Sequence, residues 1–351
     1  MLYARRAAIV LVLAAALGAL LWSLQDSSAT AQLPPTPTVS DAEVQKFVRS
    51  VSVQVLVRLE KYTRSLTWYQ EVDAKGQRGD WKVRYGEWSK QPEQVTVSGS
   101  GVIVYSNSDG FLTGTYLLTN AHVVSYLVTK ESLGSATKPI DVYHLEDLVI
   151  RDMPPSIEPK EGARPYQQMY FKLPSNYAEV RYSEDQFFTI YARVVDYDLA
   201  LDIALLQICT PSGEPARVWG LPYATLRDAP PQVGEEVWIC GAPLGIPFSI
   251  DRGRVNQVGL DLGTSGGIVW RKQTKLDIAA APGSSGSGIF DTRGYLIACL
   301  HGTLVYNGQI IRGGQLAIPC DLISEWLRWR GWAPIVTQPP YVGAPYAKAN
   351  P

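Results

Sequence analysis

The feature that most restricts the fold of this chain is a long series of short apolar segments, many of which alternate apolar and polar residues. Examples are SVQVLVRL (52–59) and FFTIYARVVDYD (187–198). Alternation with a period of two is typical of strands that bury one face. The segments are separated by turns rich in the chain's 30 glycines and 24 prolines, residues that favour tight turns. The sequence therefore predicts an all-β protein.

The strand-like segments fall into two groups of about six, divided near residue 212, which suggests two packed β-barrels. Two helices flank them. SDAEVQKFVRSV begins with a capping box formed by Ser40 and Glu43, and PCDLISEWLRWRGW is amphipathic. Residues 127–178 are rich in proline and charge without a strand or helix pattern, so we expect a long surface loop inserted there. We expect a mobile Pro/Tyr-rich tail over 334–351.

The N-terminus has a different composition. Arg5 and Arg6 precede an apolar run from Ala7 to Leu24, and the small-residue stretch at 29–31 follows. This order fits a secretory signal peptide that is cleaved before Gln32. The run is also close to the roughly 20 residues that span a bilayer, so an uncleaved membrane anchor is the alternative. Both alternatives place the rest of the chain outside the cytoplasm, in the periplasm, in the medium or on the cell surface.

Charge and cysteine content exclude several classes of protein. Charged residues make up 19% of the 351 residues and the net charge is −1, without the basic stripe typical of nucleic-acid binding. The four cysteines have no Cys-x-x-Cys spacing and there are three histidines, so we expect no metal and no cofactor. In an exported protein the cysteines can form disulfides in three connectivities; buried free thiols are the alternative. The cysteines are Cys209, Cys240, Cys299 and Cys320.

A run of small residues, APGSSGSGIF (281–290), directly precedes a strand-like segment and can present a serine on a tight turn. A serine hydroxyl is a weak nucleophile, so it needs an imidazole as base and a carboxylate that orients the imidazole. His122 lies where LLTNAHVV runs into a turn, whereas His144 lies in a polar stretch and His301 is ambiguous. Asp202 begins the apolar segment DIALLQI, where an unpaired charge would be costly to bury.

These motifs resemble those of trypsin-like serine proteases and look most like the HtrA/Deg-type branch. The segments occur in the family's order over about 95–325: GSGVIV, LLTNAHVV, DIALLQI, APGSSGSGIF, GYLIACLHG and GGQLAIP. The resemblance implies two six-stranded antiparallel β-barrels with the active cleft between them. It implies that His122 is the base, Asp202 the acid and Ser285 the nucleophile. It also implies an oxyanion hole formed by the backbone N–H groups of Gly283 and Ser285.

Two departures from the family pattern concern the nucleophile turn, because Ser284 stands in place of the family's Asn and Ser287 in place of its second Gly. The continuation Gly-Ser-Gly-Ile-Phe is similar to the glutamyl-endopeptidase branch, in which a histidine binds an acidic substrate side chain. Here Leu300 takes that position and His301 follows one residue later. The resemblance therefore implies a modest, neutral specificity pocket, without a preference for glutamate or for basic residues. Its positions are Ala279, Ala280 and Leu300.

We thus predict an exported serine endopeptidase that acts on protein or peptide substrates, with membrane association through residues 7–24 as one possibility. A catalytically inactive protease-fold binding protein and an esterase with the same triad are the alternatives. We expect no PDZ domain after the protease. The predicted parts are a signal peptide or anchor (1–31), a Pro/Thr-rich spacer (32–40), a protease domain (41–333, with barrels at 41–211 and 212–333) and the tail (334–351).

Overall fold

The computed structural model describes residues 39–108, 112–128, 138–151, 156–182, 188–218, 220–265, 267–306 and 309–349. The predicted leader, including the apolar run from Ala7 to Leu24, lies outside the described residues. None of the helices in the described ranges is both long and apolar enough to cross a membrane.

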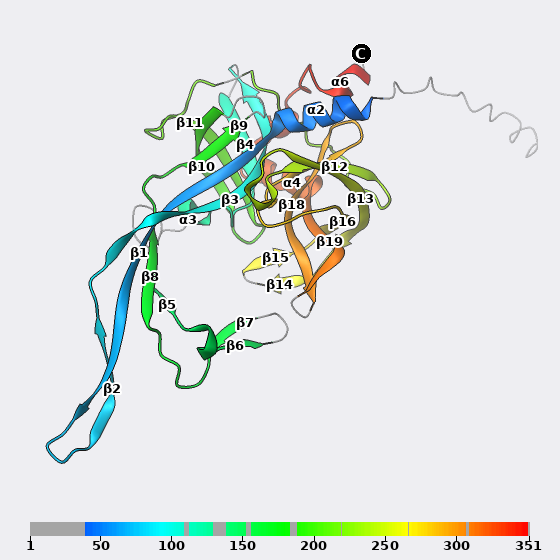
Figure 1. Cartoon of the computed structure of the whole chain (residues 1–351). Helices are drawn as coiled ribbons and strands as arrows, with labels where there is room; N and C mark the ends of the chain where they lie inside the picture. Colours follow the sequence, from blue (N-terminus) through cyan, green and yellow to red (C-terminus); the bar gives the residue numbers. More distant parts are fainter. Residues whose placement is uncertain are drawn as a thin grey trace, which may run out of the picture. The chain divides into compact units, whose positions relative to one another are not determined.

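The first barrel is a closed circuit of six strands in the order β3–β4–β11–β10–β9–β1, because β1 also pairs with β3 (Figure 1). All of these pairings are antiparallel. Every residue of β4 and of β11 is buried. The strands are β1 (Ser52–Val72), β3 (Ser89–Asn107), β4 (Gly114–Thr119), β9 (Ala178–Tyr182), β10 (Phe188–Asp198) and β11 (Ile203–Cys209).

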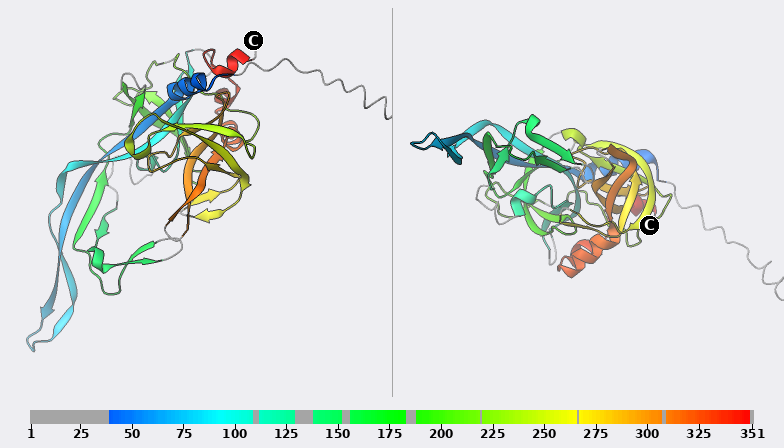
Figure 2. Two further views of the ribbon diagram at one scale, coloured as in Figure 1. Left: turned by 45° about the vertical axis from the view of Figure 1, so that its right-hand side comes forward. Right: turned by 90° about the horizontal axis from the view of Figure 1, so that it is seen from below.

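The second barrel is closed by six antiparallel strands in the order β12–β13–β16–β19–β18–β17. Both views in Figure 2 show it beside the first barrel. The prediction of two six-stranded antiparallel barrels is therefore confirmed. The strands are β12 (Glu236–Gly241), β13 (Ser249–Leu260), β16 (Gln273–Asp277), β17 (Gly288–Asp291), β18 (Leu296–Tyr306) and β19 (Gln309–Pro319).

Alternation along the strands divides the apolar side chains among three cores. In β11, Ala204 and Leu206 pack inside the first barrel, whereas Ile203 and Leu205 join a core shared with the second barrel. In β12 the same alternation sends Trp238 to the shared core. Because successive side chains point to opposite faces of a strand, each buried strand serves two cores at once. The shared core thus joins the two barrels.

Helices close the shared core from outside. Helix α2 (Asp41–Val51) begins with the predicted capping box of Ser40 and Glu43, and α4 (Cys320–Trp329) buries its apolar side. The tail, predicted to be mobile, instead packs on the domain through α5 (Ala333–Thr337) and α6 (Pro345–Ala349). Tyr346 is 2% exposed, and its ring stacks on that of Tyr295 at 4.0 Å between centroids. Burial of such aromatic area is strongly favourable, which explains the difference.

The segment at 127–178 contains strands, contrary to the expected loop without secondary structure. The outer half of β1 runs beyond the barrel, and β8 pairs with it there (Figure 1). A strand edge that carries unpaired N–H and C=O groups favours such an addition, and sequence periodicity does not reveal it. The remaining elements are β2 (Arg78–Tyr85), α3 (Ser125–Val128), β5 (Ile140–Val142), η1 (Leu145–Asp147), β6 (Leu148–Arg151), β7 (Ser156–Pro159), β8 (Gln167–Lys172), η2 (Pro243–Gly245), β14 (Gly263–Ser265) and β15 (Ile268–Trp270).

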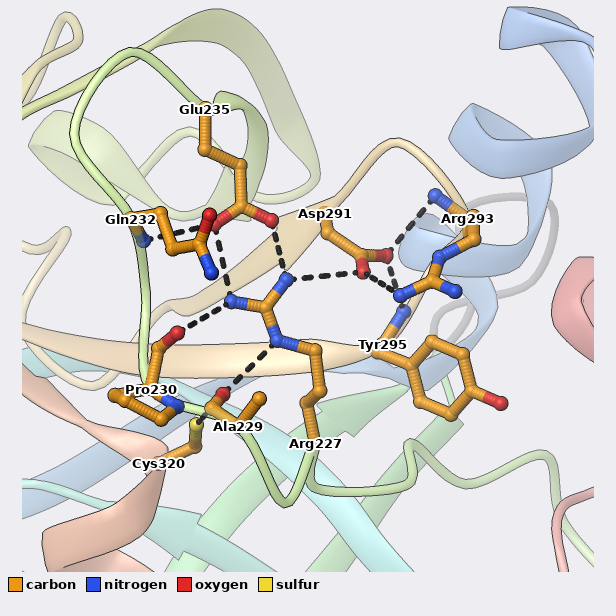
Figure 3. A network of polar contacts seen from close by, with 9 residues as sticks. All are labelled: Arg227, Ala229, Pro230, Gln232, Glu235, Asp291, Arg293, Tyr295 and Cys320. Atoms are coloured by element: carbon orange, nitrogen blue, oxygen red, sulfur yellow. Dashed lines mark hydrogen bonds and ion pairs between the residues drawn. The ribbon is translucent and has the colours of Figure 1, made fainter. Parts of the chain in front are cut away.

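A polar network anchors the connection between the barrels to the second barrel (Figure 3). The guanidinium of Arg227 donates to both carboxylate oxygens of Glu235 and to Asp291 at the end of β17. It also donates to the carbonyl oxygens of Ala229 and Pro230, at 3.0 Å each. The Arg227 side chain is 13% exposed and that of Asp291 3%, so the cation balances carboxylates that are largely removed from water.

All four cysteines are buried and none forms a disulfide, so the structure contains the buried thiols that the sequence left open as the alternative. Burial raises the pKa of Cys299 and of Cys320 to about 12. The thiolate is the reactive form of cysteine, so these two side chains are inert at neutral pH.

Candidate active site

His122 and Asp202 meet at the edge of the first barrel. His122 lies on the turn that follows β4, and Asp202 directly precedes β11, the strand paired with β4. The His122 Nδ1 is 2.8 Å from Asp202 Oδ2, and the His122 backbone N–H donates to Asp202 Oδ1 at 2.9 Å. Asn120 Nδ2 donates to the Asp202 carbonyl oxygen at 3.0 Å. Three hydrogen bonds therefore fix the relative position of the two side chains.

The backbone of Asp202 has φ 58°, in the left-handed region that Asp tolerates better than most residues. The preceding turn is capped by Asp198, whose Oδ1 accepts from the N–H groups of Ala200 and Leu201. Asp196 instead binds Arg330 and the indole of Trp332. Asp196 and Asp198 are thus structural, and Asp202 is the carboxylate that faces a histidine.

The contact with Asp202 determines the tautomer of His122. A carboxylate only accepts hydrogen bonds, so the proton of the neutral imidazole is on Nδ1 and the lone pair is on Nε2. Burial alone would raise the pKa of Asp202, but the hydrogen bonds from His122 and His301 outweigh it and hold the pKa below its usual value. Asp202 is therefore ionised at neutral pH, and His122 presents a basic nitrogen away from it.

Ser285 lies on a tight turn that enters β17 of the second barrel. The turn has φ 99° at Gly283 and φ 90° at Gly286. A Cβ on Gly286 would lie 2.0 Å from the carbonyl oxygen of Ser100 and 2.5 Å from Thr119 Oγ1, so only glycine fits there. The small residues of this stretch therefore permit the turn to approach the first barrel closely. One point of approach is Thr119, which lies three residues before His122. Within the described residues, Ser285 Oγ forms no hydrogen bond with His122.

Two backbone N–H groups of the turn are left without an acceptor in the described structure. The carbonyl of Pro282 accepts from Leu244, and that of Ser284 accepts from Ser287. Because N–H and C=O point in opposite directions across a trans peptide, the N–H groups of Gly283 and Ser285 point away from these contacts. The N–H groups of Ser284, Gly286 and Ser287 all donate within the protein. The free pair is the one predicted for an oxyanion hole.

Ser100, on β3 of the first barrel, holds this turn by two hydrogen bonds and the neighbouring Ala242 by a third. Its Oγ donates to the Gly283 carbonyl oxygen at 2.8 Å and accepts from the Ala242 N–H at 2.9 Å. Its backbone N–H donates to the Ser285 carbonyl oxygen at 2.7 Å. Ser100 is completely buried, and Thr119 Oγ1 donates to its carbonyl oxygen at 2.6 Å. One residue thus positions both peptides that follow the two free N–H groups.

His301, which the sequence left ambiguous, is a second histidine on the acid. Its side chain is completely buried, with Nδ1 3.3 Å from Asp202 Oδ2 and Nε2 2.6 Å from Gln273 Oε1. The indole of Trp270 lies against its ring, with 4.5 Å between centroids. His144, by contrast, is exposed and stacks on Tyr166. His301 therefore supports Asp202 and does not bind substrate.

A cavity of about 180 Å³ lies beside Ser285. Ser285 lines it together with Ala280 and Leu300, two of the three residues predicted for a specificity pocket. Ala279 instead lines a neighbouring cavity of about 310 Å³, because its N–H donates to Asp251 Oδ2 at 2.7 Å and draws the backbone to that side. Among the described residues, no group of three or more His, Cys, Asp or Glu side chains is arranged to hold a metal ion.

Sequence reasoning predicted His122, Asp202 and Ser285 as the residues that carry chemistry, and it missed some of the residues that position them. Ser100 is a polar residue in the largely apolar segment GSGVIV, and Gln315 is a polar residue in the segment GGQLAIP. This deviation from the apolar pattern is a signal that could have identified both residues. The role of His301 depends on its register against Asp202 across the two barrels. That register has no local signal in the sequence.

Residues 99–298 match the family model described as the trypsin-like peptidase domain. This match covers more than half of the chain and includes His122, Asp202 and Ser285. No curated protein matches the sequence significantly.

Similar solved structures include the HtrA-type protease AlgW with a tripeptide, which is 19% identical, with TM-score 0.47, over 85% of this chain and 64% of that chain. Deg5 is 16% identical, with TM-score 0.45, over 83% of this chain and 95% of that one. An inactive form of Rv3671c from M. tuberculosis is 17% identical, with TM-score 0.44, over 88% and 97%. The present chain thus spans less than two thirds of the AlgW chain.

Proposed function

This chain belongs to the trypsin-like peptidase family, and on this basis we propose that it is a serine endopeptidase with Ser285 as nucleophile. One arrangement of groups carries the proposal: His122 Nδ1 lies 2.8 Å from Asp202 Oδ2, and two N–H groups on the turn of Ser285 have no acceptor in the described structure. A nucleophile, a base with its orienting acid, and donors for an oxyanion are the parts that acyl transfer requires.

In the first half-reaction, Ser285 Oγ attacks the carbonyl carbon of the scissile peptide while its proton passes to His122 Nε2. The carbonyl electron pair moves to oxygen, where the N–H groups of Gly283 and Ser285 stabilise the negative charge. Each such donor lowers the barrier by about 3 kcal/mol. When the C–N bond breaks, Nε2 returns the proton to the leaving amine, and an acyl-enzyme remains. Asp202 stabilises the imidazolium throughout.

In the second half-reaction, water takes the place of the amine. His122 Nε2 removes a proton from the water as its oxygen attacks the acyl carbon, and the same two N–H groups again hold the oxyanion. Collapse releases the carboxylic acid and returns the proton to Ser285 Oγ. By the end of the cycle Ser285 and His122 have regained their starting protonation states and no group has been oxidised or reduced, so no cofactor is needed.

The first experiment is hydrolysis of a fluorogenic peptide library by the folded domain, with Ser285→Ala as the inactive variant. Ser287→Ala is the matched control, because the buried Ser287 Oγ has no hydrogen-bond partner in the described structure. We expect peptide cleavage that is lost in Ser285→Ala and kept in Ser287→Ala. Cleavage that survives Ser285→Ala would move the nucleophile elsewhere. Hydrolysis of esters without peptides would favour the esterase, and neither activity would favour the binding protein.

We also propose that the protein is exported, and that the segment from Ala7 to Leu24 serves as a signal peptide or anchor. The support is the order of two arginines, an apolar run and small residues at 29–31. Mass spectrometry of the N-terminus from expressing cells tests this. A mature end at Gln32 indicates cleavage, and an intact leader in the membrane fraction indicates an anchor. A full-length chain in the cytosol would contradict export.

A further inference from the structure

The cavity beside Ser285 contains no charged side chain. One wall is formed by Ala280, Ala281 and Pro282, and the other by residues of β18. Gln315 of β19 also lines it. The cavity is therefore mostly apolar with a single amide side chain in its wall, a combination that fixes the orientation of a ligand through few polar contacts.

The amide of Gln315 is unpartnered. Gln315 is 6% exposed, and its side chain forms no hydrogen bond within the described residues. The amide atoms of Gln315 lack a partner but are not sealed from solvent. They are therefore reached through the cavity that Gln315 lines. An unpaired amide in a nearly buried residue is uncommon, because most buried polar groups have a partner.

Thr303 is a second unpartnered polar residue at the same place. It lies directly opposite Gln315 in the β18–β19 pairing and lines the same cavity. Its Oγ1 is buried without a hydrogen-bond partner in the described structure. Side chains directly opposite in antiparallel strands are neighbours on one face. The two side chains are thus neighbours, but the Thr303 Oγ1 is sealed from solvent, so only the Gln315 amide is open to the cavity.

The chemistry of the Gln315 amide decides which substrate side chains are favoured. An apolar side chain would expel water and leave the amide of Gln315 without a partner, which costs free energy. A charged side chain would lose its hydration without gaining a counter-charge, which costs more. An amide side chain offers both a donor and an acceptor, so it can pair with the Gln315 amide.

We propose that Gln315 makes this cavity selective for glutamine at the substrate residue before the scissile bond (P1). The inference rests on the proposed function, since the cavity receives a substrate side chain only if Ser285 is the nucleophile. Size agrees with this assignment. A cavity of about 150 Å³ holds benzene, so about 180 Å³ accepts the five non-hydrogen atoms of a glutamine side chain. An indole is too large, and asparagine is one methylene shorter.

The test compares peptides that differ at P1 alone, with Gln, Leu, Met, Glu or Lys. The folded domain, Gln315→Leu, Gln315→Glu and Thr303→Val are assayed for kcat/KM. Gln257→Leu is the matched control, because Gln257 is exposed on β13. Each protein is also titrated with a fluorophosphonate, which reports the reactivity of Ser285 independently of P1.

We expect the Gln peptide to be cleaved at least about 10-fold better than the Leu and Met peptides, about the effect of one stranded polar group. Gln315→Leu should reverse this order, and Gln315→Glu should raise Lys cleavage about 10-fold or more. Thr303→Val should leave the Gln preference within about 2-fold, because the Thr303 Oγ1 is not open to the cavity. Gln257→Leu should change nothing. If Ser285 is labelled but the enzyme prefers Leu, Met or a charged residue at P1, the inference is wrong and the proposed function stands. The same holds if Ser285 is labelled and Gln315→Leu leaves the P1 preference unchanged. Absence of both labelling and cleavage would overturn the proposed function with it.

Discussion

Replacement of Ser100 by alanine tests how the first barrel positions the catalytic turn of the second. The substitution removes Oγ and therefore two hydrogen bonds, to the Gly283 carbonyl oxygen and from the Ala242 N–H. The backbone bond from Ser100 to Ser285 remains. The variant thus loosens the turn at one of the two oxyanion donors without altering the nucleophile, the base or the acid.

The magnitude follows from what is left unpaired. Ala242 is 1% exposed, so its N–H is stranded at a cost of about 1–3 kcal/mol, and the lost bond to Gly283 adds about 1 kcal/mol. We expect stability to fall by about 2–4 kcal/mol. Loss of a complete oxyanion donor lowers kcat by about 10²–10³, and Gly283 is displaced rather than removed, so kcat should fall by about 10–100-fold. KM should change little, because the donor acts on charge that develops in the transition state.

The assay is steady-state peptide hydrolysis well below the melting temperature, together with the affinity of a peptide aldehyde, which forms an oxyanion on the serine. Ser98→Ala is the matched control: Ser98 lies on the same strand, and its Oγ accepts only from Gln54. We expect Ser100→Ala to lose kcat and aldehyde affinity in parallel and Ser98→Ala to lose neither. A folded Ser100→Ala with full kcat would refute the positioning role.

Three further predictions concern the acid, the polar network and the thiols. Asp202→Asn should keep the fold but lower kcat by about 10⁴, because the wrong imidazole tautomer is favoured. Since the folded pKa of Asp202 is lowered, its stabilising contribution is present above the unfolded value, about 3.9, and is lost as pH falls through the folded pKa. When acid unfolding is monitored by circular dichroism, the stability of Asp202→Asn should thus fall less steeply with decreasing pH than that of the unsubstituted protein. Arg227→Met should lower stability by about 1–3 kcal/mol, because Glu235 loses its cation whereas Asp291 keeps its ion pair with Arg293. Arg254→Met, at a residue 65% exposed, should change stability by less than about 1 kcal/mol in urea melts. Cys299 and Cys320 should resist iodoacetamide at pH 8 in the folded protein and react in urea, as read by mass spectrometry.

Local patterns predicted what depends on local chemistry. The apolar segment DIALLQI predicted a strand, and β11 is buried along its whole length. The capping box predicted the start of α2, and the small residues of APGSSGSGIF predicted a tight turn, where Gly283 and Gly286 have positive φ. Such features are set by a few neighbouring residues, so a single sequence contains them.

Contacts between distant segments were not predictable in this way. The pairing of β8 with the outer half of β1 depends on an edge that exists only after β1 has extended beyond the barrel. The contact of His301 with Asp202 joins residues 99 apart in sequence across two barrels. The docked tail buries Tyr346 against residues of α2 and of the second barrel. In each case the contact is determined by tertiary packing, and the local sequence pattern either gave no prediction or predicted the wrong structure.

The most direct test of the central claim is a crystal structure of the protein treated with a peptide boronate. The account predicts a covalent bond from Ser285 Oγ to boron. One boronate oxygen should lie within about 2.7–3.1 Å of the backbone nitrogens of both Gly283 and Ser285. His122 Nε2 should lie within hydrogen-bond distance of Ser285 Oγ or of a second boronate oxygen. An adduct on another residue, or an adduct on Ser285 whose oxygens avoid both N–H groups, would contradict it.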